Sequence, residues 1–202
     1  MTYLRNCWYA AAWSHEVVGT RPLARQLLGE HVVLFRTETG TLTLLADRCP
    51  HRFAPLSMGK VVGETIQCPY HGLRFGTDGA CAHNPHYDAL PKAAQVKSWP
   101  VLERHGMIWC WPGDAPADPG ALPADFAFLD DQGFTAVRGY LPVAGNYQLV
   151  IDNLLDLTHA DFLHEGTLSS ESITVSKLET LEAGSTVWAN RWCPDGLPPP
   201  VW

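Results

Sequence analysis

Short apolar stretches alternate with turns from about residue 24 to residue 111. Five stretches are rich in Val, Leu, Ile, Thr and aromatic residues: 31–36, 41–46, 65–75, 94–101 and 107–111. Turns that contain Gly40, Gly63 or Gly79 separate most of them. Runs of this kind between glycine turns are typical of antiparallel strands. We therefore expect a β domain made of several small antiparallel sheets, with loops at one end.

The pattern changes at residues 112–123, where four prolines fall within twelve residues. Such a density of proline excludes regular structure and marks a linker or a domain boundary. Beyond it, residues 148–164 carry apolar side chains at helical spacing and contain no proline or glycine, which predicts a helix. Residues 173–178 and 185–192 return to the alternation of strands.

Composition and charge narrow the class of protein. A chain of 202 residues that is 46% hydrophobic and 17% charged is typical of a globular protein. The net charge of −7 argues against non-specific binding of nucleic acid, which needs a basic face. The longest apolar run, Cys7–Trp13, is too short to cross a bilayer. Arg5 and the tryptophans also make this run a poor signal peptide, so we expect a cytoplasmic protein with no membrane partner.

Two of the six cysteines stand in the same loop as a histidine. One loop reads Arg48-Cys49-Pro50-His51-Arg52 and the other reads Cys68-Pro69-Tyr70-His71-Gly72, with sixteen residues between His51 and Cys68. That separation allows a strand pair to return the second loop beside the first. Without a signal peptide, uneven cysteine spacing does not indicate a disulfide framework. Cys7, Cys81, Cys110 and Cys193 have no histidine partner, and we expect them to be small buried apolar residues.

Two metal sites could use one cysteine and one histidine from each loop. Zinc accepts a Cys2His2 set, but structural zinc sites usually take like ligands from one loop, as in Cys-x-x-Cys. A binuclear iron–sulfur cluster suits the mixed loops better, with both cysteines on one iron and both histidines on the other. Two neutral imidazoles in place of two thiolates raise the reduction potential from about −400 mV to roughly −150 mV or above. The spacing therefore favours a Rieske [2Fe–2S] cluster that accepts and passes on electrons.

The predicted helix carries a second group of candidate ligands. Asp156 and His159 lie three residues apart and share a helix face. His159 and His164 lie five apart, about 140° around an ideal helix, so they converge only if the helix bends or the side chains splay. Two imidazoles and one carboxylate form the facial triad of non-haem Fe(II) oxygenases, although two histidines on an apolar helix can also be ordinary core residues. Asp156 is either the third ligand or a carboxylate that orients a histidine.

Both groups, in this order, resemble the α subunit of Rieske non-haem iron oxygenases, in particular the group that contains vanillate O-demethylase, dicamba monooxygenase and toluenesulfonate methyl-monooxygenase. The likeness also covers the opening Arg5-Asn-Cys-Trp-Tyr-Ala, the segment Ile108-Trp-Cys-Trp-Pro-Gly-Asp114 and the segment Ile151-Asp-Asn-Leu-Leu-Asp-Leu-Thr-His159. It implies an α+β chain. An all-β Rieske domain over residues 1–115 would precede part of a helix-grip (START-like) catalytic domain over residues 116–202.

The resemblance also implies roles for the candidate residues. Cys49 and Cys68 would bind one iron of the cluster, and His51 and His71 the other. His159 and His164 would bind a mononuclear Fe(II). Asp156 would then hydrogen-bond the cluster histidine His71 of a neighbouring subunit in a head-to-tail ring, usually a trimer. Asn153 matches a polar residue near the iron.

The family's activity follows as an expectation. A ferredoxin or flavin reductase that draws on NAD(P)H would supply electrons, and O2 would be used to hydroxylate or O-demethylate a small aromatic substrate. Ring dihydroxylation, a plain Rieske electron carrier and a zinc-stabilised module are the alternatives. The family's third iron ligand is an aspartate far downstream, for which this sequence holds no candidate, and Asp195 has the setting of a turn residue. The sequence is therefore expected to be a fragment of a longer chain.

Overall fold

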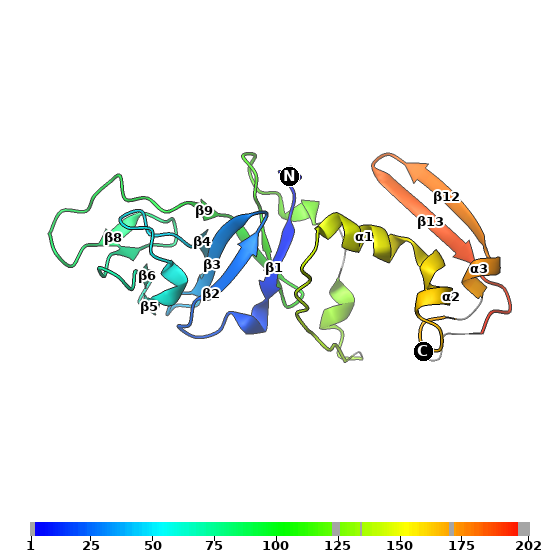
Figure 1. The fold of residues 1–202 in the computed structure, drawn as a ribbon. Coiled ribbons are helices and arrows are strands. Elements are labelled where there is room, and N and C mark those ends of the chain that lie inside the picture. Colours follow the sequence, from blue (N-terminus) through cyan, green and yellow to red (C-terminus); the bar gives the residue numbers. More distant parts are fainter. Residues whose placement is uncertain (1–2, 123–125, 134, 170–171, 198–202) are drawn as a thin grey trace. The chain divides into compact units, whose positions relative to one another are not determined.

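The computed structural model describes residues 3–122, 126–133, 135–169 and 172–197 (Figure 1). Its contacts divide the chain into two compact units, Met1–Gly139 and Tyr140–Trp202. Each unit is described by itself. The domain boundary expected after residue 115 stays a prediction, while the first compact unit extends to Gly139.

The described part of unit 1 contains three small antiparallel sheets, as the apolar pattern predicted. The first sheet has the order β1–β11–β10, with β1 at Tyr9–Trp13, β11 at Met107–Cys110 and β10 at Val101–Arg104. The second has the order β2–β3–β4–β9, at Leu23–Leu27, Glu30–Arg36, Leu42–Ala46 and Ser98–Trp99. The third has the order β5–β6–β7–β8, at Lys60–Val62, Thr65–Gln67, Arg74–Phe75 and Cys81–His83.

Two expectations for this unit need correction. The stretch 65–75 is not one strand: β6 and β7 pair across a turn that carries Cys68 and His71. The strands β1, β2, β5, β8 and all but the first residue of β10 were not singled out from the sequence, and the stretch 94–101 forms only β9 at Ser98–Trp99 before β10 begins. They are only three to five residues long, which leaves little periodicity to read.

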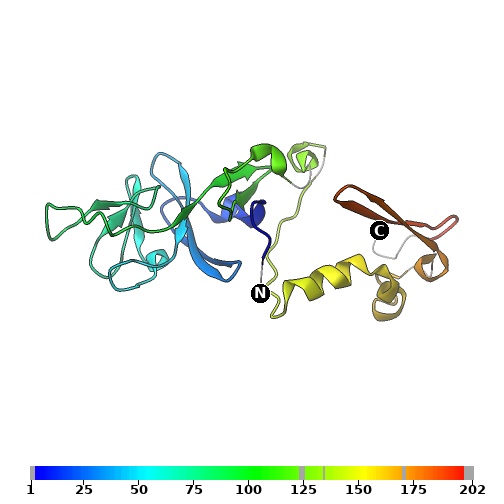
Figure 2. The ribbon, with the colours of Figure 1, turned by 90° about the horizontal axis from the view of Figure 1, so that it is seen from above.

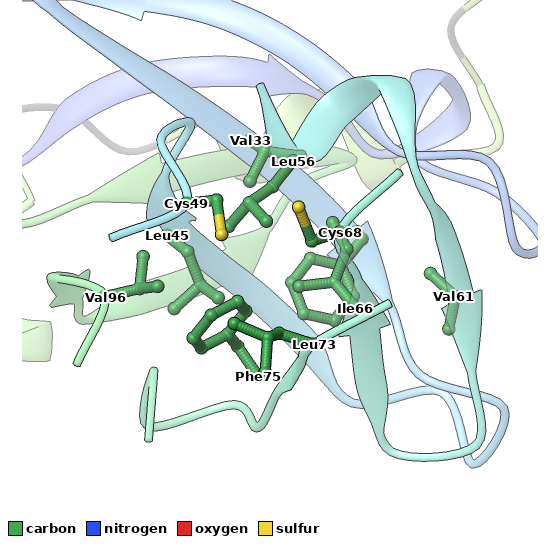
Figure 3. Close-up of a cluster of buried hydrophobic side chains, with 11 residues drawn as sticks. Val33, Leu45, Cys49, Leu56, Val61, Ile66, Cys68, Leu73, Phe75 and Val96 are labelled. Carbon is green, nitrogen blue, oxygen red and sulfur yellow. The ribbon is translucent and has the colours of Figure 1, made fainter. Parts of the chain in front are cut away.

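Strand β3 is buried on both faces and divides the core of unit 1 in two. Because side chains alternate along a strand, Val33 and Phe35 face one cluster while Val32 and Leu34 face the other. The first cluster is drawn in Figure 3, and its buried members are Val33, Phe35, Leu45, Cys49, Leu56, Val61, Ile66, Cys68, Leu73, Phe75 and Val96. Both candidate cluster cysteines therefore lie in a hydrophobic core.

The proline-rich segment packs on unit 1 through tryptophans. The indole N–H of Trp8 donates to the carbonyl of Asp118 at 2.6 Å, and that of Trp111 donates to the carbonyl of Ala115 at 2.9 Å. Further on, Trp13 donates to the carbonyl of Gly139 at 2.9 Å. The segment holds one 3-10 turn, η3 at Pro119–Ala121, so the expectation of no regular structure was slightly too strict.

Unit 2 consists of short helices followed by a hairpin (Figure 2). Helix α1 spans Tyr147–Leu155, the 3-10 turn η5 spans Leu157–His159 and α2 spans Ala160–Leu163. A further turn, α3 at Ser172–Val175, leads into β12 at Lys177–Ala183, which pairs in full with β13 at Thr186–Trp192. The single helix predicted over 148–164 was wrong, because the chain is extended at Asp156. The strand predicted at 173–178 was wrong in its first part, where α3 forms.

No helix within the described residues is long and apolar enough to cross a membrane. The predicted α+β class is confirmed, with β structure dominating unit 1 and helices confined mainly to unit 2.

Candidate metal centres

The two cysteine–histidine loops share one backbone turn. In the first loop the N–H of Cys49 donates to the carbonyl of Ala54, and the N–H of Phe53 donates to the carbonyl of Cys49, both at 2.9 Å. In the second loop Cys68 donates to Leu73 at 2.8 Å and Gly72 donates to Cys68 at 3.2 Å. The spacings are the same: five residues for one bond and four for the other. Both cysteines therefore occupy the same position, at the start of equivalent backbone turns.

The fourth residue after each cysteine has a left-handed backbone. Gly72 has φ +74°, which glycine adopts without strain, whereas Phe53 has φ +59° in the equivalent position. The Arg48 guanidinium lies 3.8 Å from the centre of the Phe53 ring, a cation–π contact that offsets part of the strain. The first loop thus uses a side-chain contact where the second uses a glycine.

The cysteines point inward and carry little exposure. Cys49 and Cys68 are each 1% exposed and lie on the same side of the core cluster in Figure 3. The pKa of the Cys49 thiol is raised to about 11, chiefly by burial and also by the neighbouring Cys68 thiol, while hydrogen bonds from the backbone N–H groups of His51 and Arg52 lower it. Cysteine thiols release their protons when a metal binds them.

The histidines of the same loops form a second, outward pair. The ring centres of His51 and His71 lie 4.5 Å apart, and the exposed Tyr70 ring stacks on His71 at 3.9 Å. Partial desolvation lowers the pKa of His71, and the positive charges of His51, His86 and Arg52 lower it further. The neutral imidazole, which is the form that binds metal, is favoured.

These four side chains form two pairs rather than one tetrahedral set. Nowhere in the described residues do three His, Cys, Asp or Glu side chains come together as they must to hold a single metal ion. A Cys2His2 zinc site would require such a group. A buried thiol pair beside an imidazole pair with one exposed and one partly buried ring instead matches the two irons of a Rieske cluster. When bound, such a cluster accepts and releases one electron.

Sequence reasoning missed the segment that supports the second loop. The His86 ring Nε2 lies 3.1 Å from the carbonyl oxygen of His71, to which it can donate, and the His86 N–H donates to the Asn84 side chain. Pro85 lies so close to Gly72 that an added Cβ there would be 3.1 Å from its ring. Only the Asn-Pro-His sequence itself could have drawn attention to this segment, because its contact with His71 is tertiary.

The second candidate centre forms where the predicted helix breaks. Asp156 is extended, with φ −92° and ψ 94°, and the turn η5 begins directly after it. Beyond this break the chain runs through η5 and the short helix α2, and the ring centres of His159 and His164 lie 5.4 Å apart, edge to face. The expectation was that these histidines converge only if the helix bends or the side chains splay, and they converge in this irregular stretch rather than on one α-helix.

Hydrogen bonds orient the His159 ring. Its Nδ1 lies 2.5 Å from the carbonyl oxygen of Asp156, which can only accept, so Nδ1 carries the proton. Nε2 is then the atom with a free lone pair for a metal. The side-chain amide of Asn153 lies 3.4 Å from that Nε2. Asn153 is therefore beside the position that a metal on His159 would occupy.

Asp156 directs its carboxylate to its own turn. Its Oδ1 accepts from the N–H of Thr158 at 3.0 Å and from the Thr158 hydroxyl. These bonds lower the pKa of the Asp156 carboxyl below its ordinary value. In this conformation Asp156 caps η5 and makes no group of three with the histidines within the described residues. Asp195 lies in a turn at φ +58°, as its setting predicted.

Comparison with known proteins identifies both parts of the chain. Residues 7–100 match the Rieske [2Fe-2S] domain, and residues 143–202 match the vanillate O-demethylase oxygenase C-terminal domain. The two cysteine–histidine loops, the buried cysteines and the match to this domain together define a Rieske iron–sulfur protein. More particularly, the chain belongs to the Rieske oxygenase components of the vanillate O-demethylase type, as its resemblance implied.

Individual relatives and structures support this family. The oxygenase component of dicamba O-demethylase from Stenotrophomonas maltophilia is 44% identical over 98% of this chain and 58% of that protein. The vanillate O-demethylase oxygenase subunit of a Pseudomonas strain (HR199) is 35% identical over 98% of this chain and 55% of that protein. The crystal structure of dicamba monooxygenase bound to dicamba has 43% identity and a TM-score of 0.91, covering 98% of this chain and 60% of that one. The chain thus spans a little under three fifths of these curated relatives.

Proposed function

We propose that this chain belongs to the oxygenase component of a Rieske non-haem iron monooxygenase that hydroxylates or O-demethylates a small aromatic substrate. The observation that carries the proposal is the pairing of two kinds of centre. One is built from a buried cysteine pair and an outward histidine pair, and the other from two histidines whose rings lie 5.4 Å apart just after a helix break.

Each candidate residue has a role in this proposal. Cys49 and Cys68 hold one iron of the cluster, and His51 and His71 hold the other. His159 and His164 hold a mononuclear Fe(II), which supplies the capacity to activate O2 when it is bound. The Asp156 carbonyl keeps the His159 Nε2 available for the metal. The Asn153 amide donates hydrogen bonds to molecules beside that metal.

The reaction is proposed from chemistry and from the named relatives. The relatives include demethylases of dicamba and vanillate, and a solved dicamba monooxygenase holds dicamba. For an aryl methyl ether, O2, two electrons and two protons hydroxylate the methyl carbon and release water. The resulting hemiacetal loses formaldehyde and leaves a phenol. Net O-demethylation follows without breaking the ring–oxygen bond.

The surface around the histidine pair supports the proposed partners. Tyr70 stacks on His71 and is 64% exposed, and a hollow of about 390 Å³ is lined by His51, His71, His86 and the exposed Tyr87 among others. Exposed aromatic rings at an electron entry point suit transient contact with a ferredoxin or an NAD(P)H-dependent flavin reductase. We further propose a homotrimer, in which Asp156 of one subunit bonds His71 of the next, and a cytoplasmic location.

The decisive test combines metal analysis with spectroscopy. We expect about three irons and two acid-labile sulfides per chain, and a Rieske EPR signal averaging near g ~1.9 after reduction. His159→Ala and His164→Ala should each remove one iron and leave the EPR signal unchanged. His15→Ala, an exposed histidine outside both centres, is the control and should keep all three.

Other outcomes would replace the proposal. Two irons in the parent protein with the same signal would leave a Rieske electron carrier. Zinc without sulfide would point to a zinc-stabilised module. A cis-diol product from an aromatic substrate, in place of a phenol and formaldehyde, would show ring dihydroxylation.

A further inference from the structure

The two cluster loops are closed at their base in different ways. In the second loop, Gln67 and Arg74 flank the turn and face each other in the β6–β7 ladder, and the Arg74 side chain also donates to the Gln67 side chain at 3.2 Å. The first loop leaves β4 and enters the 3-10 turn η2 at Leu56–Met58. No ladder joins the two ends of this loop, all of whose residues the structure describes. Something else must hold these ends together.

Asp47 and Ser57 supply that closure. Asp47 Oδ1 accepts from the Ser57 N–H at 2.7 Å, and Asp47 Oδ2 accepts from the Ser57 hydroxyl at 2.5 Å. Both carboxylate oxygens of Asp47 therefore bind a single residue, Ser57, which lies ten positions later at the far end of the loop. Both residues are partly buried, so these charge-assisted bonds are less screened by water than surface pairs.

Each end of this closure is anchored to the sheets. On one side the Asp47 N–H donates to the carbonyl of His31 in β3 at 2.9 Å. On the other, Ser57 sits in η2 beside Leu56, which is fully buried in the same core cluster as Cys49. The bonds therefore connect two fixed points and confine the segment between them, which carries Cys49 and His51.

The closure also sets the first loop against the second. Directly after η2, Gly59 approaches the carbonyl of Gln67 so closely that an added Cβ would lie 1.9 Å from that oxygen. Gln67 immediately precedes Cys68, and Lys60 pairs with Gln67 in β5–β6. A displacement of η2 would therefore be passed to the residue before the second cysteine.

We propose that Asp47 and Ser57 are positioning residues of the metal centre, which close the first ligand loop as the β6–β7 ladder closes the second. They hold Cys49 and His51 at the separation from Cys68 and His71 that a binuclear cluster requires. Neither residue touches the cluster position in this role. The inference rests on the proposed function only in assuming that the cluster is the resident group.

The chain contains a matched control for this pair. Glu64 accepts from the Thr39 N–H at 3.2 Å and from the Thr39 hydroxyl at 2.8 Å, so one carboxylate again binds the N–H and hydroxyl of one residue. This second pair also lies in unit 1, but it joins the turn between β3 and β4 to the turn between β5 and β6, not the two ends of a ligand loop. Ser57→Ala and Thr39→Ala therefore remove the same kind of bond, one at a ligand loop and one elsewhere.

The experiment measures cluster retention in the full-length holoprotein. We expect Ser57→Ala to accelerate loss of iron and sulfide to a chelator about tenfold, the factor corresponding to one charge-assisted hydrogen bond. Its midpoint potential should rise, because water reaching the loosened loop favours the more negative reduced state. Ser57→Thr keeps a hydroxyl at this position and should show the parent's rate of cluster loss and the parent's EPR spectrum. Asp47→Asn, which can keep neutral hydrogen bonds to Ser57, should lie between the parent and Ser57→Ala.

The control decides the interpretation. If Thr39→Ala loses the cluster as fast as Ser57→Ala, or if Ser57→Ala keeps the parent's rate, potential and EPR spectrum, the positioning role is refuted. If Ser57→Ala fails to fold, the rates of cluster loss from the parent, Ser57→Thr and Asp47→Asn test the same proposal. Asp47→Asn should then lose the cluster faster than the other two. Absence of a Rieske signal in the parent protein would instead refute the proposed function, so the two failures are distinguishable.

Discussion

Three buried thiols in unit 1 occupy similar surroundings, but only two belong to the metal centre. Cys49 and Cys68 lie beside each other with a histidine in each loop, whereas Cys110 lies in β11 and is 2% exposed. Burial raises the pKa of Cys110 to about 12, with the nearby Cys7 adding to it. At the residue scale, Cys110 behaves as the small buried residue that its lack of a histidine partner predicted. The same expectation was wrong for Cys7, Cys81 and Cys193, which are only partly buried.

The raised pKa of Cys110 predicts alkaline destabilisation. Because its folded pKa lies above the unfolded value of 9.0, the neutral buried thiol contributes its full stability below pH 9 and loses it as the pH rises toward 12. Raising the pH from about 8 to about 10.5 should therefore lower the unfolding free energy of the holoprotein by roughly 2 kcal/mol through this thiol. Urea titrations at both pH values measure it. Cys110→Ala should flatten the pH dependence, and Cys81→Ala, at a partly exposed cysteine, should not.

At the scale of elements, the important feature is where the long apolar helix breaks. Apolar spacing continues through Asp156, so periodicity alone predicts one helix over 148–164. The Asp156 carboxylate instead binds the N–H and hydroxyl of Thr158, a local hydrogen bond that competes with the helical one. Past the break, η5 and the four-residue α2 replace a regular α-helix. The rings of His159 and His164, which one regular α-helix would hold about 140° apart, lie 5.4 Å from each other.

This break can be tested separately from electron transfer through Asp156. Thr158→Val removes the hydroxyl partner but keeps the Asp156 carboxylate, so we expect it to lower iron occupancy at His159 and His164 while the cluster keeps its EPR signal. Asp156→Asn can still cap the turn and should retain the iron, but it should slow turnover. Full iron occupancy in Thr158→Val would show that the cap does not position the histidines. Thr39→Val, which removes a hydroxyl bound to Glu64 in unit 1, is the control.

At the scale of the whole molecule, unit 1 extends beyond the proline-rich segment. Trp8, Trp109 and Trp111 form a buried cluster in which Phe126 stacks on Trp109 at 5.9 Å. His105 also meets Asp130 at 2.5 Å. Prolines excluded long regular elements as expected, but they did not make the segment a free linker, because the tryptophans bind its carbonyls.

Two fragments test this extent. Residues 1–139 should bind two irons and two sulfides with the EPR signal of the full chain. Residues 1–115 should unfold at a temperature lower by about 10 °C, as expected for roughly 2 kcal/mol of lost aromatic contact and hydrogen bonds in a domain of this size. Equal unfolding temperatures would instead place the boundary near residue 115, as the family resemblance implied.

The sequence by itself determined which residues can bind metal and how each loop presents them. Thiols, imidazoles and their spacing within one turn are local properties, so Cys49-Pro-His51 and Cys68-Pro-Tyr-His71 could be read without a fold. The small antiparallel sheets could also be predicted, because the alternation of apolar residues and the glycine turns are local patterns.

Only the tertiary structure decided which contacts hold those residues in place. It laid the His51 ring 4.5 Å from the His71 ring and joined Asp47 to Ser57 at the base of a loop. These contacts depend on where strands and turns bring atoms that are distant along the chain, and sequence spacing does not specify them. The chemistry and its two groups of ligands could therefore be predicted from the residues themselves, while the contacts that hold the ligand loops came from long-range packing.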